Sequence, residues 1–130
     1  MSKLNTLLSL AMVIMFANTL KAQHAGDLDL NFNGTGYSRI DFYGNTDVVN
    51  DIAVQTDHKI IAAGVAFTAS WNIDVKIIRL NEDGTADASY GNDGTVSYAP
   101  QGLSYYEAHA MAVTLQPDGK ILVAGGVLDN

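Results

Sequence analysis

The segment at residues 55–64 reads QTDHKIIAAG, and the segment at residues 116–125 reads QPDGKILVAG. Six of the ten positions are identical at an offset of 61 residues. In each segment a polar turn precedes a run of apolar residues, and the second turn holds an Asp-Gly pair, which is a strong β-hairpin signal. The chain therefore contains a repeated hairpin, and an internal repeat at a fixed offset is typical of solenoids, propellers and arrays.

A second motif repeats at an offset of 58 residues, as GDLDLNFNGTG at residues 26–36 and GTADASYGNDG at residues 84–94. The first copy also matches the beginning of an EF-hand calcium loop, because oxygen-bearing side chains alternate along it. These side chains are Asp29, Asn31 and Asn33. The second copy loses the alternation, and the twelfth loop position is Ile40, where calcium needs a glutamate. We interpret the motif as a turn and expect no metal site; weak calcium binding at the three residues stays open.

Four short strands are predicted in one repeat unit, at residues 51–55, 59–66, 73–80 and 94–99. Some of these strands are apolar at consecutive positions, as at Ile77 and Ile78, which indicates burial on both faces. Four antiparallel strands per repeat, covered on both faces by neighbouring copies, are typical of a β-propeller blade. We therefore predict an all-β fold of one full blade plus partial blades, in which residues 36–42 form the outer strand of another blade. A β-sandwich is the alternative, but it does not explain a repeated four-strand unit.

The pattern G-x-x-D-x-x-[FY], followed by Q-x-D-x-K-I-[IL]-x-A-G, resembles the delta-60 repeat of secreted bacterial proteins. The resemblance covers residues 26–126, and it implies a β-propeller of several tandem copies. The first copy departs from the pattern at Thr56 and His58, where the second copy has Pro117 and Gly119. His58 is interpreted as a turn residue, since histidine tolerates a left-handed backbone better than most residues. The family is defined by its repeat, so the resemblance implies no activity.

The repeat divides the chain into copies at about 26–83 and 84–130, with the second copy incomplete. Propellers typically close with about 4–8 blades. We therefore expect residues 23–130 to be the N-terminal part of a delta-60-type propeller with an incomplete ring, and further blades of a longer chain to be its partners.

The first 22 residues have the layout of a secretory signal peptide. Lys3 gives a basic start, the run LLSLAMVIMFA follows at residues 7–17, and the small residue Ala22 precedes Gln23. The apolar run is shorter than the ~20 residues that span a bilayer. We predict cleavage near Ala22, a secreted or cell-surface bacterial protein, and no membrane span in the mature chain.

The mature part is strongly acidic, with five Lys and Arg against fourteen Asp and Glu, so that its net charge is 5 − 14 = −9. A phosphate backbone would be repelled by this charge, so we expect no nucleic acid partner. The chain holds no cysteine, and its sequence carries no pattern for a cofactor, so we expect none.

Loops at residues 43–48, 67–72 and 99–108 are predicted at one end of the blade, where they vary between copies and carry aromatic residues. Binding groups tend to lie on variable loops that a rigid frame positions. We predict Trp71, Tyr105 and Tyr106 as ligand-binding residues, with an extracellular glycan or protein as the partner. The alternative is that these rings only cap the end of the blade.

Catalysis finds little support, and we predict no catalytic residue. Glu107 and His109 would share a face of a strand, but one pair without a nucleophile or a ligand set is not an active site. The predicted function is a secreted, non-enzymatic β-propeller repeat module for binding or scaffolding. The alternative is the N-terminal part of a propeller enzyme that acts on extracellular glycans, with its catalytic residues on absent blades.

Overall fold

The computed structural model describes residues 25–129, so the predicted signal peptide lies outside the described residues. Apart from one 3₁₀ turn, η1 (Phe32–Gly34), the regular structure of this part of the chain is all strand, which confirms the predicted all-β fold. The strands are β1 (Asp47–Val54), β2 (Ile60–Phe67), β3 (Ile73–Leu80), β4 (Thr95–Tyr98), β5 (Tyr106–Leu115) and β6 (Ile121–Asp129). Within residues 25–129, no helix is long and apolar enough to cross a membrane.

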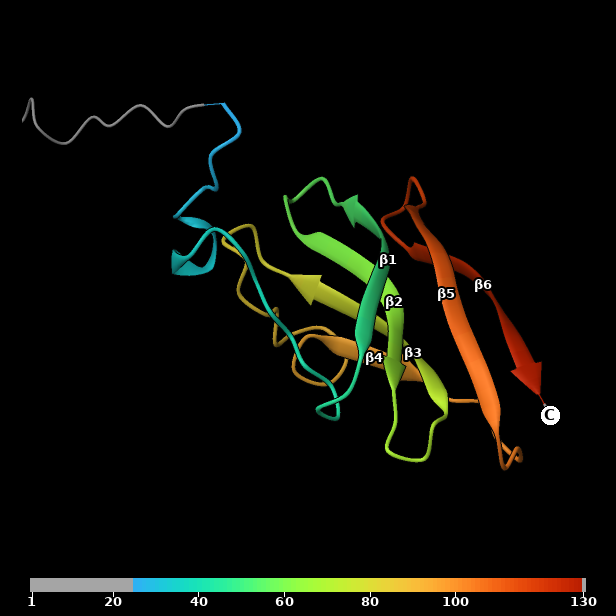
Figure 1. Ribbon diagram of the computed structural model, residues 1–130. Helices are drawn as coiled ribbons and strands as arrows, with labels where there is room; N and C mark the ends of the chain where they lie inside the picture. The colour runs from blue at the N-terminus through green and yellow to red at the C-terminus, as the bar shows by residue number, and fades with distance from the viewer. Residues whose placement is uncertain (1–24, 130) are drawn as a thin grey trace, which may run out of the picture.

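The first four strands form an antiparallel meander, which we call blade 1 (Figure 1). β2 and β3 pair over their full length, from Ile60 opposite Leu80 to Phe67 opposite Ile73. These two central strands are largely buried on both faces, as their consecutive apolar residues predict. β4 pairs with the free edge of β3 and completes the blade.

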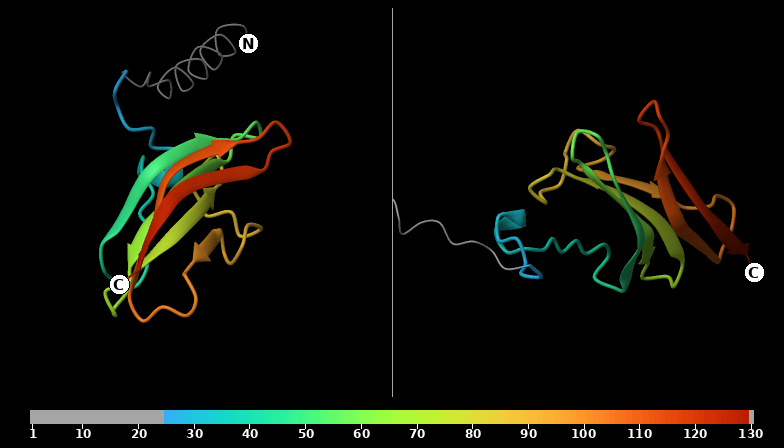
Figure 2. Two further views of the ribbon diagram at one scale, coloured as in Figure 1. Left: turned by 90° about the vertical axis from the view of Figure 1, so that its right-hand side faces the viewer. Right: turned by 90° about the horizontal axis from the view of Figure 1, so that it is seen from above.

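The hairpin of β5 and β6 stands against one face of blade 1, and we call it blade 2 (Figure 2). The ladder between the two units is a single parallel pair, Ile73 with Glu107, so side-chain packing joins them instead. Their shared core lies between the two sheets, and its buried members are Ile61, Ala63, Val75, Tyr106, Ala108, Ala110 and Val113. One complete blade with half of a second blade on its face is consistent with part of a β-propeller.

The other face of blade 1 is crossed by residues 32–42, which we call the strap. Here the prediction was wrong, because residues 36–42 form no strand. The strap lies across the face of the sheet and not along its edge, so its backbone has no neighbouring strand to pair with. Its apolar side chains pack on the sheet instead: Phe32, Ile40 and Phe42 contact a cluster of Ala62, Ile78 and Leu80.

Both hairpins carry a β-bulge at the same place. The register shifts between Val49 and Asp51 in the first hairpin and between Ala110 and Ala112 in the second. A glycine faces each bulge, and a Cβ atom there would meet backbone: 1.9 Å from the Val48 carbonyl oxygen at Gly64, and 1.8 Å from the His109 carbonyl oxygen at Gly125. The bulge therefore explains why the repeated motif ends in glycine.

Candidate functional site

The antiparallel strand order gathers the connections at two ends of the molecule (Figure 1). The loop end holds residues 43–46, 68–72 and 99–105, and the turn end holds residues 55–59, 81–94 and 116–120. Sequence reasoning predicts this division, and each end carries a polar cluster of its own.

The turn end is organised around Asp87, the aspartate of the repeated turn motif. Its Oδ2 accepts hydrogen bonds from Lys59 Nζ at 2.6 Å and Arg79 Nε at 2.7 Å, and its Oδ1 accepts from the backbone and hydroxyl of Ser89. The hydrogen bond from Lys59 is the main cause that holds the pKa of Asp87 well below its usual range. Arg79 also stacks over the Tyr90 ring, 4.7 Å from its centre. The Asp and Lys of the repeat therefore form a structural ion pair inside one blade.

The first copy of the turn, at Asp29, has the same backbone hydrogen bonds. Phe32 N donates to Asp29 O at 2.9 Å, as Tyr90 N donates to Asp87 O at 2.9 Å. The Asp29 carboxylate accepts the Asn31 backbone N–H at 3.0 Å, which is the local bond of an Asx turn. No three His, Cys, Asp or Glu side chains are grouped for a metal ion within residues 25–129. The Asp29 carboxylate thus takes part in a turn, as the repeat indicates.

At the loop end, a polar network lies beneath the loops, around the buried Asp74. Its carboxylate accepts hydrogen bonds from Tyr106 Oη at 2.6 Å and from Tyr43 Oη at 2.9 Å. Lys76 Nζ donates to Tyr43 Oη and to Ser97 Oγ, each at 2.8 Å, and lies 3.9 Å from Asp74 Oδ2. The hydrogen bond to Asp74 raises the pKa of Tyr106 to about 12. The network ties β3, β4, β5 and the segment after the strap together under the loop end.

The three predicted ligand-binding residues come to the loop end but differ in accessibility. Tyr106 is buried, and its hydroxyl is engaged by Asp74. Tyr105 is half-buried, and its hydroxyl donates to Glu107 Oε1 at 2.6 Å, which raises the pKa of Tyr105. Trp71 is 77% exposed. Of the three residues, Trp71 thus has the most exposed ring, whereas Tyr106 belongs to the supporting network.

Sequence reasoning missed Asp74 and Lys76, which are charged and yet nearly inaccessible. The signal that could have found them is their place in the strand sequence IDVKIIRL, where two charges sit two residues apart among apolar neighbours. Such spacing puts both side chains on one face of a strand, and buried charges need partners.

Trp71 is presented by a tight loop between β2 and β3. Trp71 N donates to Thr68 O at 3.1 Å, and Thr68 N donates to Asn72 O at 2.9 Å. These bonds hold Trp71 at a φ of 64°, a left-handed conformation that is a real outlier for a bulky residue. Asn72 Oδ1 accepts the Tyr106 backbone N–H at 3.1 Å and so anchors the loop to β5.

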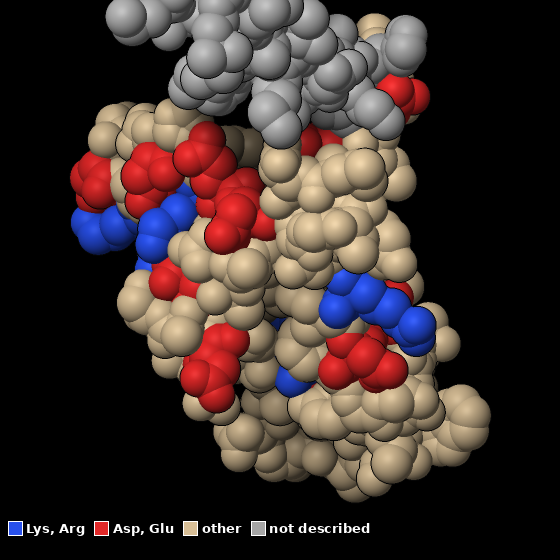
Figure 3. All heavy atoms as spheres, turned by 90° about the vertical axis from the view of Figure 1, so that its left-hand side faces the viewer, with Lys and Arg blue, Asp and Glu red and all other residues tan. Residues whose placement is uncertain are grey.

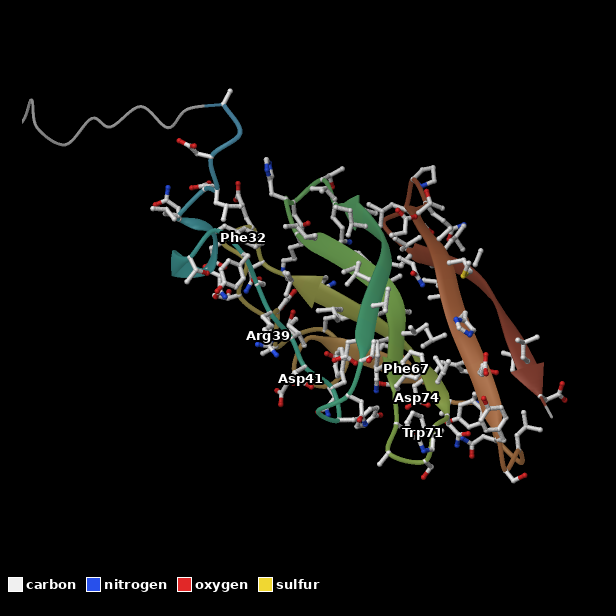
Figure 4. All side chains as sticks on the ribbon, viewed as in Figure 1. Phe32, Arg39, Asp41, Phe67, Trp71 and Asp74 are labelled. Carbon is white, nitrogen blue, oxygen red and sulfur yellow. The ribbon has the colours of Figure 1, made fainter. Side chains whose placement is uncertain are left out.

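A cleft of about 390 Å³ opens beside Trp71, between the loop at residues 67–71 and residues 44–46. None of its side chains is charged, and apart from the methyl group of Ala69 they are aromatic, hydroxyl or amide groups: Asn45, Thr46, Phe67, Thr68, Ala69 and Trp71. Figure 3 shows acidic side chains over the upper and middle parts of the strap face, while the lowest part, at the loop end, shows no Lys, Arg, Asp or Glu. Figure 4 shows Trp71, Phe67 and Asp74 at this same end. The cleft thus offers an aromatic face beside neutral hydrogen-bonding groups.

Glu107 and His109 share a face of β5, as their spacing predicts. The Glu107 carboxylate accepts the Tyr105 hydroxyl, which lowers the pKa of Glu107, and its other oxygen lies 3.5 Å from His109 Nε2. Both carboxylate oxygens of Glu107 therefore lie next to groups of the protein.

Two parts of the chain, residues 55–90 and 116–130, match a family described as a domain of unknown function (DUF5122) beta-propeller. The matched segments begin at Gln55 and Gln116, the first residues of the two hairpin motifs. No curated protein and no solved structure matches the chain. The sequence match and the four-stranded blade together support a propeller-type repeat family.

Proposed function

We propose that the chain is a secreted, non-enzymatic repeat module of the delta-60 type that binds a ligand at the loop end. The exposed Trp71, held at positive φ, is the observation that carries this proposal. A non-glycine residue in that conformation costs on the order of 1–3 kcal/mol, and such strained residues cluster at ligand contacts. Neither burial nor backbone geometry favours tryptophan here, so a contact outside the fold gives the residue its role.

The chemistry of the cleft favours a neutral saccharide. The Trp71 indole offers an apolar face on which a sugar ring can lie, and indole rings suit sites that are partly apolar and partly wet. Asn45, Thr46 and Thr68 supply amide and hydroxyl groups for sugar hydroxyls. A charged ligand would lose water here without gaining a counter-charge, because no charged side chain lines the cleft.

Binding at this site can be followed directly, since Trp71 is the only tryptophan in the chain. Titration with neutral oligosaccharides should move the indole emission to shorter wavelength and saturate. Calorimetry should then show an affinity at least about tenfold weaker for Trp71→Ala. Tyr37→Ala, which removes another exposed ring from the strap, is the matched control and should bind like the wild type.

Two results would redirect this proposal. Equal saccharide affinity for wild type and Trp71→Ala would remove Trp71 from the site. A response to uncharged peptides alone would replace the saccharide with a peptide ligand.

Secretion rests on the sequence pattern of residues 1–22. Expression in a bacterial host with an export pathway should release a product that begins at Gln23. Mass spectrometry of the extracellular and periplasmic fractions tests this, and an intact N-terminus in the cytoplasm would contradict it.

A further inference from the structure

The cleft beside Trp71 has two walls, and a different loop makes each of them. The first wall is residues 44–46, and the second wall is formed within residues 67–71. The walls meet where Phe67 N donates a hydrogen bond to Thr46 O at 3.0 Å. This bond joins the backbones of the two loops, so the shape of the cleft depends on how each loop is held.

The first wall begins directly after Tyr43, whose backbone is strained. Tyr43 has a φ of 65°, a left-handed conformation that is an outlier for a bulky residue. Such a conformation persists only where the surrounding structure over-determines it. The Tyr43 hydroxyl donates to Asp74 Oδ2 at 2.9 Å and accepts from Lys76 Nζ at 2.8 Å, and this ammonium lies 4.5 Å from the centre of the Tyr43 ring. The Tyr43 side chain thus fixes the backbone from which the first wall starts.

The second wall ends at Asn72, which is tied to the same carboxylate through one other residue. Asn72 Oδ1 accepts the Tyr106 backbone N–H at 3.1 Å, and Tyr106 Oη donates to Asp74 Oδ1 at 2.6 Å. Asn72 also closes its own loop, because its backbone N donates to Thr68 Oγ1 at 3.1 Å and its carbonyl accepts Thr68 N at 2.9 Å. Each wall is therefore tied to one oxygen of Asp74, which is only 5% exposed.

We infer that Tyr43 and Asn72 are positioning residues of the cleft, and that each holds one wall on Asp74. The residues that line the cleft are their neighbours in the two loops, so Tyr43 and Asn72 act on a ligand through the walls. For its effect on binding, this inference rests on the proposed saccharide site. The order of the walls is measurable without any ligand.

Amide hydrogen exchange of the full chain without ligand tests the two walls separately. Tyr43→Phe removes the hydroxyl and keeps the ring, so the amides of Gly44 and Phe67 should exchange at least about tenfold faster. Asn72→Ala should instead accelerate exchange at the amide of Thr68. Amides in the middle of the β2–β3 pair should keep their rates in both variants, which separates the loosening of one wall from a lower global stability.

Binding provides the second measurement. Calorimetry with the neutral oligosaccharide that saturates the Trp71 emission should show an affinity at least about threefold weaker for Tyr43→Phe and for Asn72→Ala. Asn72→Asp keeps an oxygen for the Tyr106 N–H, so it should retain the exchange rates and the affinity of the wild type. Tyr37→Phe removes the hydroxyl of an exposed tyrosine of the strap and is the matched control, which should change neither measurement. Circular dichroism of each variant establishes that the strands are retained.

The outcomes separate this inference from the proposed function. If the wild type binds no neutral oligosaccharide, the proposed function fails, and the exchange rates alone decide the inference. If binding depends on Trp71 but is equally strong in Tyr43→Phe and Asn72→Ala, the inference is overturned and the proposed function stands. Exchange at the walls that both variants leave unchanged would also overturn it.

Discussion

The first hairpin, β1–β2, and the second hairpin, β5–β6, have the same local structure in opposite surroundings. Gln55 N donates to Lys59 O at 2.8 Å, and Gln116 N donates to Lys120 O at 2.8 Å. Both hairpins have a bulge at the same position. Yet every residue of β2 between its two end residues is buried, whereas every residue of β6 after the first is exposed. The motif therefore encodes the shape of a hairpin, while its neighbours determine how much that hairpin contributes to stability.

The strongest test of this comparison is truncation at matched positions. Ile61→Ala removes a fully buried side chain and should lower the free energy of unfolding by about 3 kcal/mol. Leu122→Ala, at the equivalent exposed position, should change it by less than about 0.5 kcal/mol. Urea unfolding at low protein concentration measures both, and equal losses would show that β6 is covered in solution.

The bulge glycines make the next pair. Gly64→Ala and Gly125→Ala place a Cβ against backbone to the same degree, so each should destabilise its own hairpin by about 2–3 kcal/mol. The two variants should differ in how much of the molecule opens, because opening β2 disrupts all of blade 1, whereas β6 can detach alone. Hydrogen exchange should show faster exchange across β1–β3 in the first variant and only in β5–β6 in the second. Exchange that spreads over blade 1 in both variants would contradict this.

Lys59 and Lys120, the lysines of the two hairpin motifs, should contribute differently to the pH dependence of stability in acid. Lys59 binds the buried Asp87, whose pKa is lowered in the folded state. The ionised Asp87 therefore stabilises the fold fully above the pKa that it has in the unfolded chain, near 3.8, and this stabilisation is lost as the pH falls below that value. Lys59→Met should therefore destabilise the protein at neutral pH and flatten the loss of stability below about pH 4. Lys120 pairs with the exposed Asp118, and an exposed pair of this kind contributes little. Lys120→Met should leave the acid unfolding curve nearly unchanged, and thermal melts from pH 2 to 7 provide the measurement.

The smallest effect concerns the turn residues. His58 has a φ of 65°, and its equivalent Gly119 has a φ of 82°. His58→Gly relieves the strain of a left-handed residue, so it should raise the free energy of unfolding by about 0.5–1 kcal/mol. Gly119→His should lower it by a similar amount. A loss of stability in His58→Gly would mean that its contact with Glu82, 3.5 Å away, outweighs the strain.

The sequence is sufficient to predict the hairpins, the blade and the two ends, because these depend on turn residues and on apolar runs close together in the chain. It does not predict the strap. Residues 36–42 read GYSRIDF, an extended pattern that suits a strand. Whether an extended segment pairs along an edge or crosses a face depends on which neighbours it meets, and sequence patterns within the segment do not contain that information.

The candidate site divides in the same way. The position of Trp71 at the loop end follows from strand order, but its difference from Tyr106 does not. Tyr106 is engaged because Asp74, 32 residues earlier in the sequence, lies within hydrogen-bonding distance of it. A contact between distant residues of this kind fixes which aromatic ring is buried as a support and which stays exposed.

The bulge opposite Gly64 and Gly125 has a consequence for how such a molecule can grow. A β-bulge bends its strand and increases the local twist, so β1 and β5 each carry a bend of their own. Because the register shift and the facing glycine both lie within the repeated hairpin, each copy of the repeat carries the bend in its own sequence. One extra residue and one missing side chain are thus enough to place the same bend in every hairpin that carries the motif.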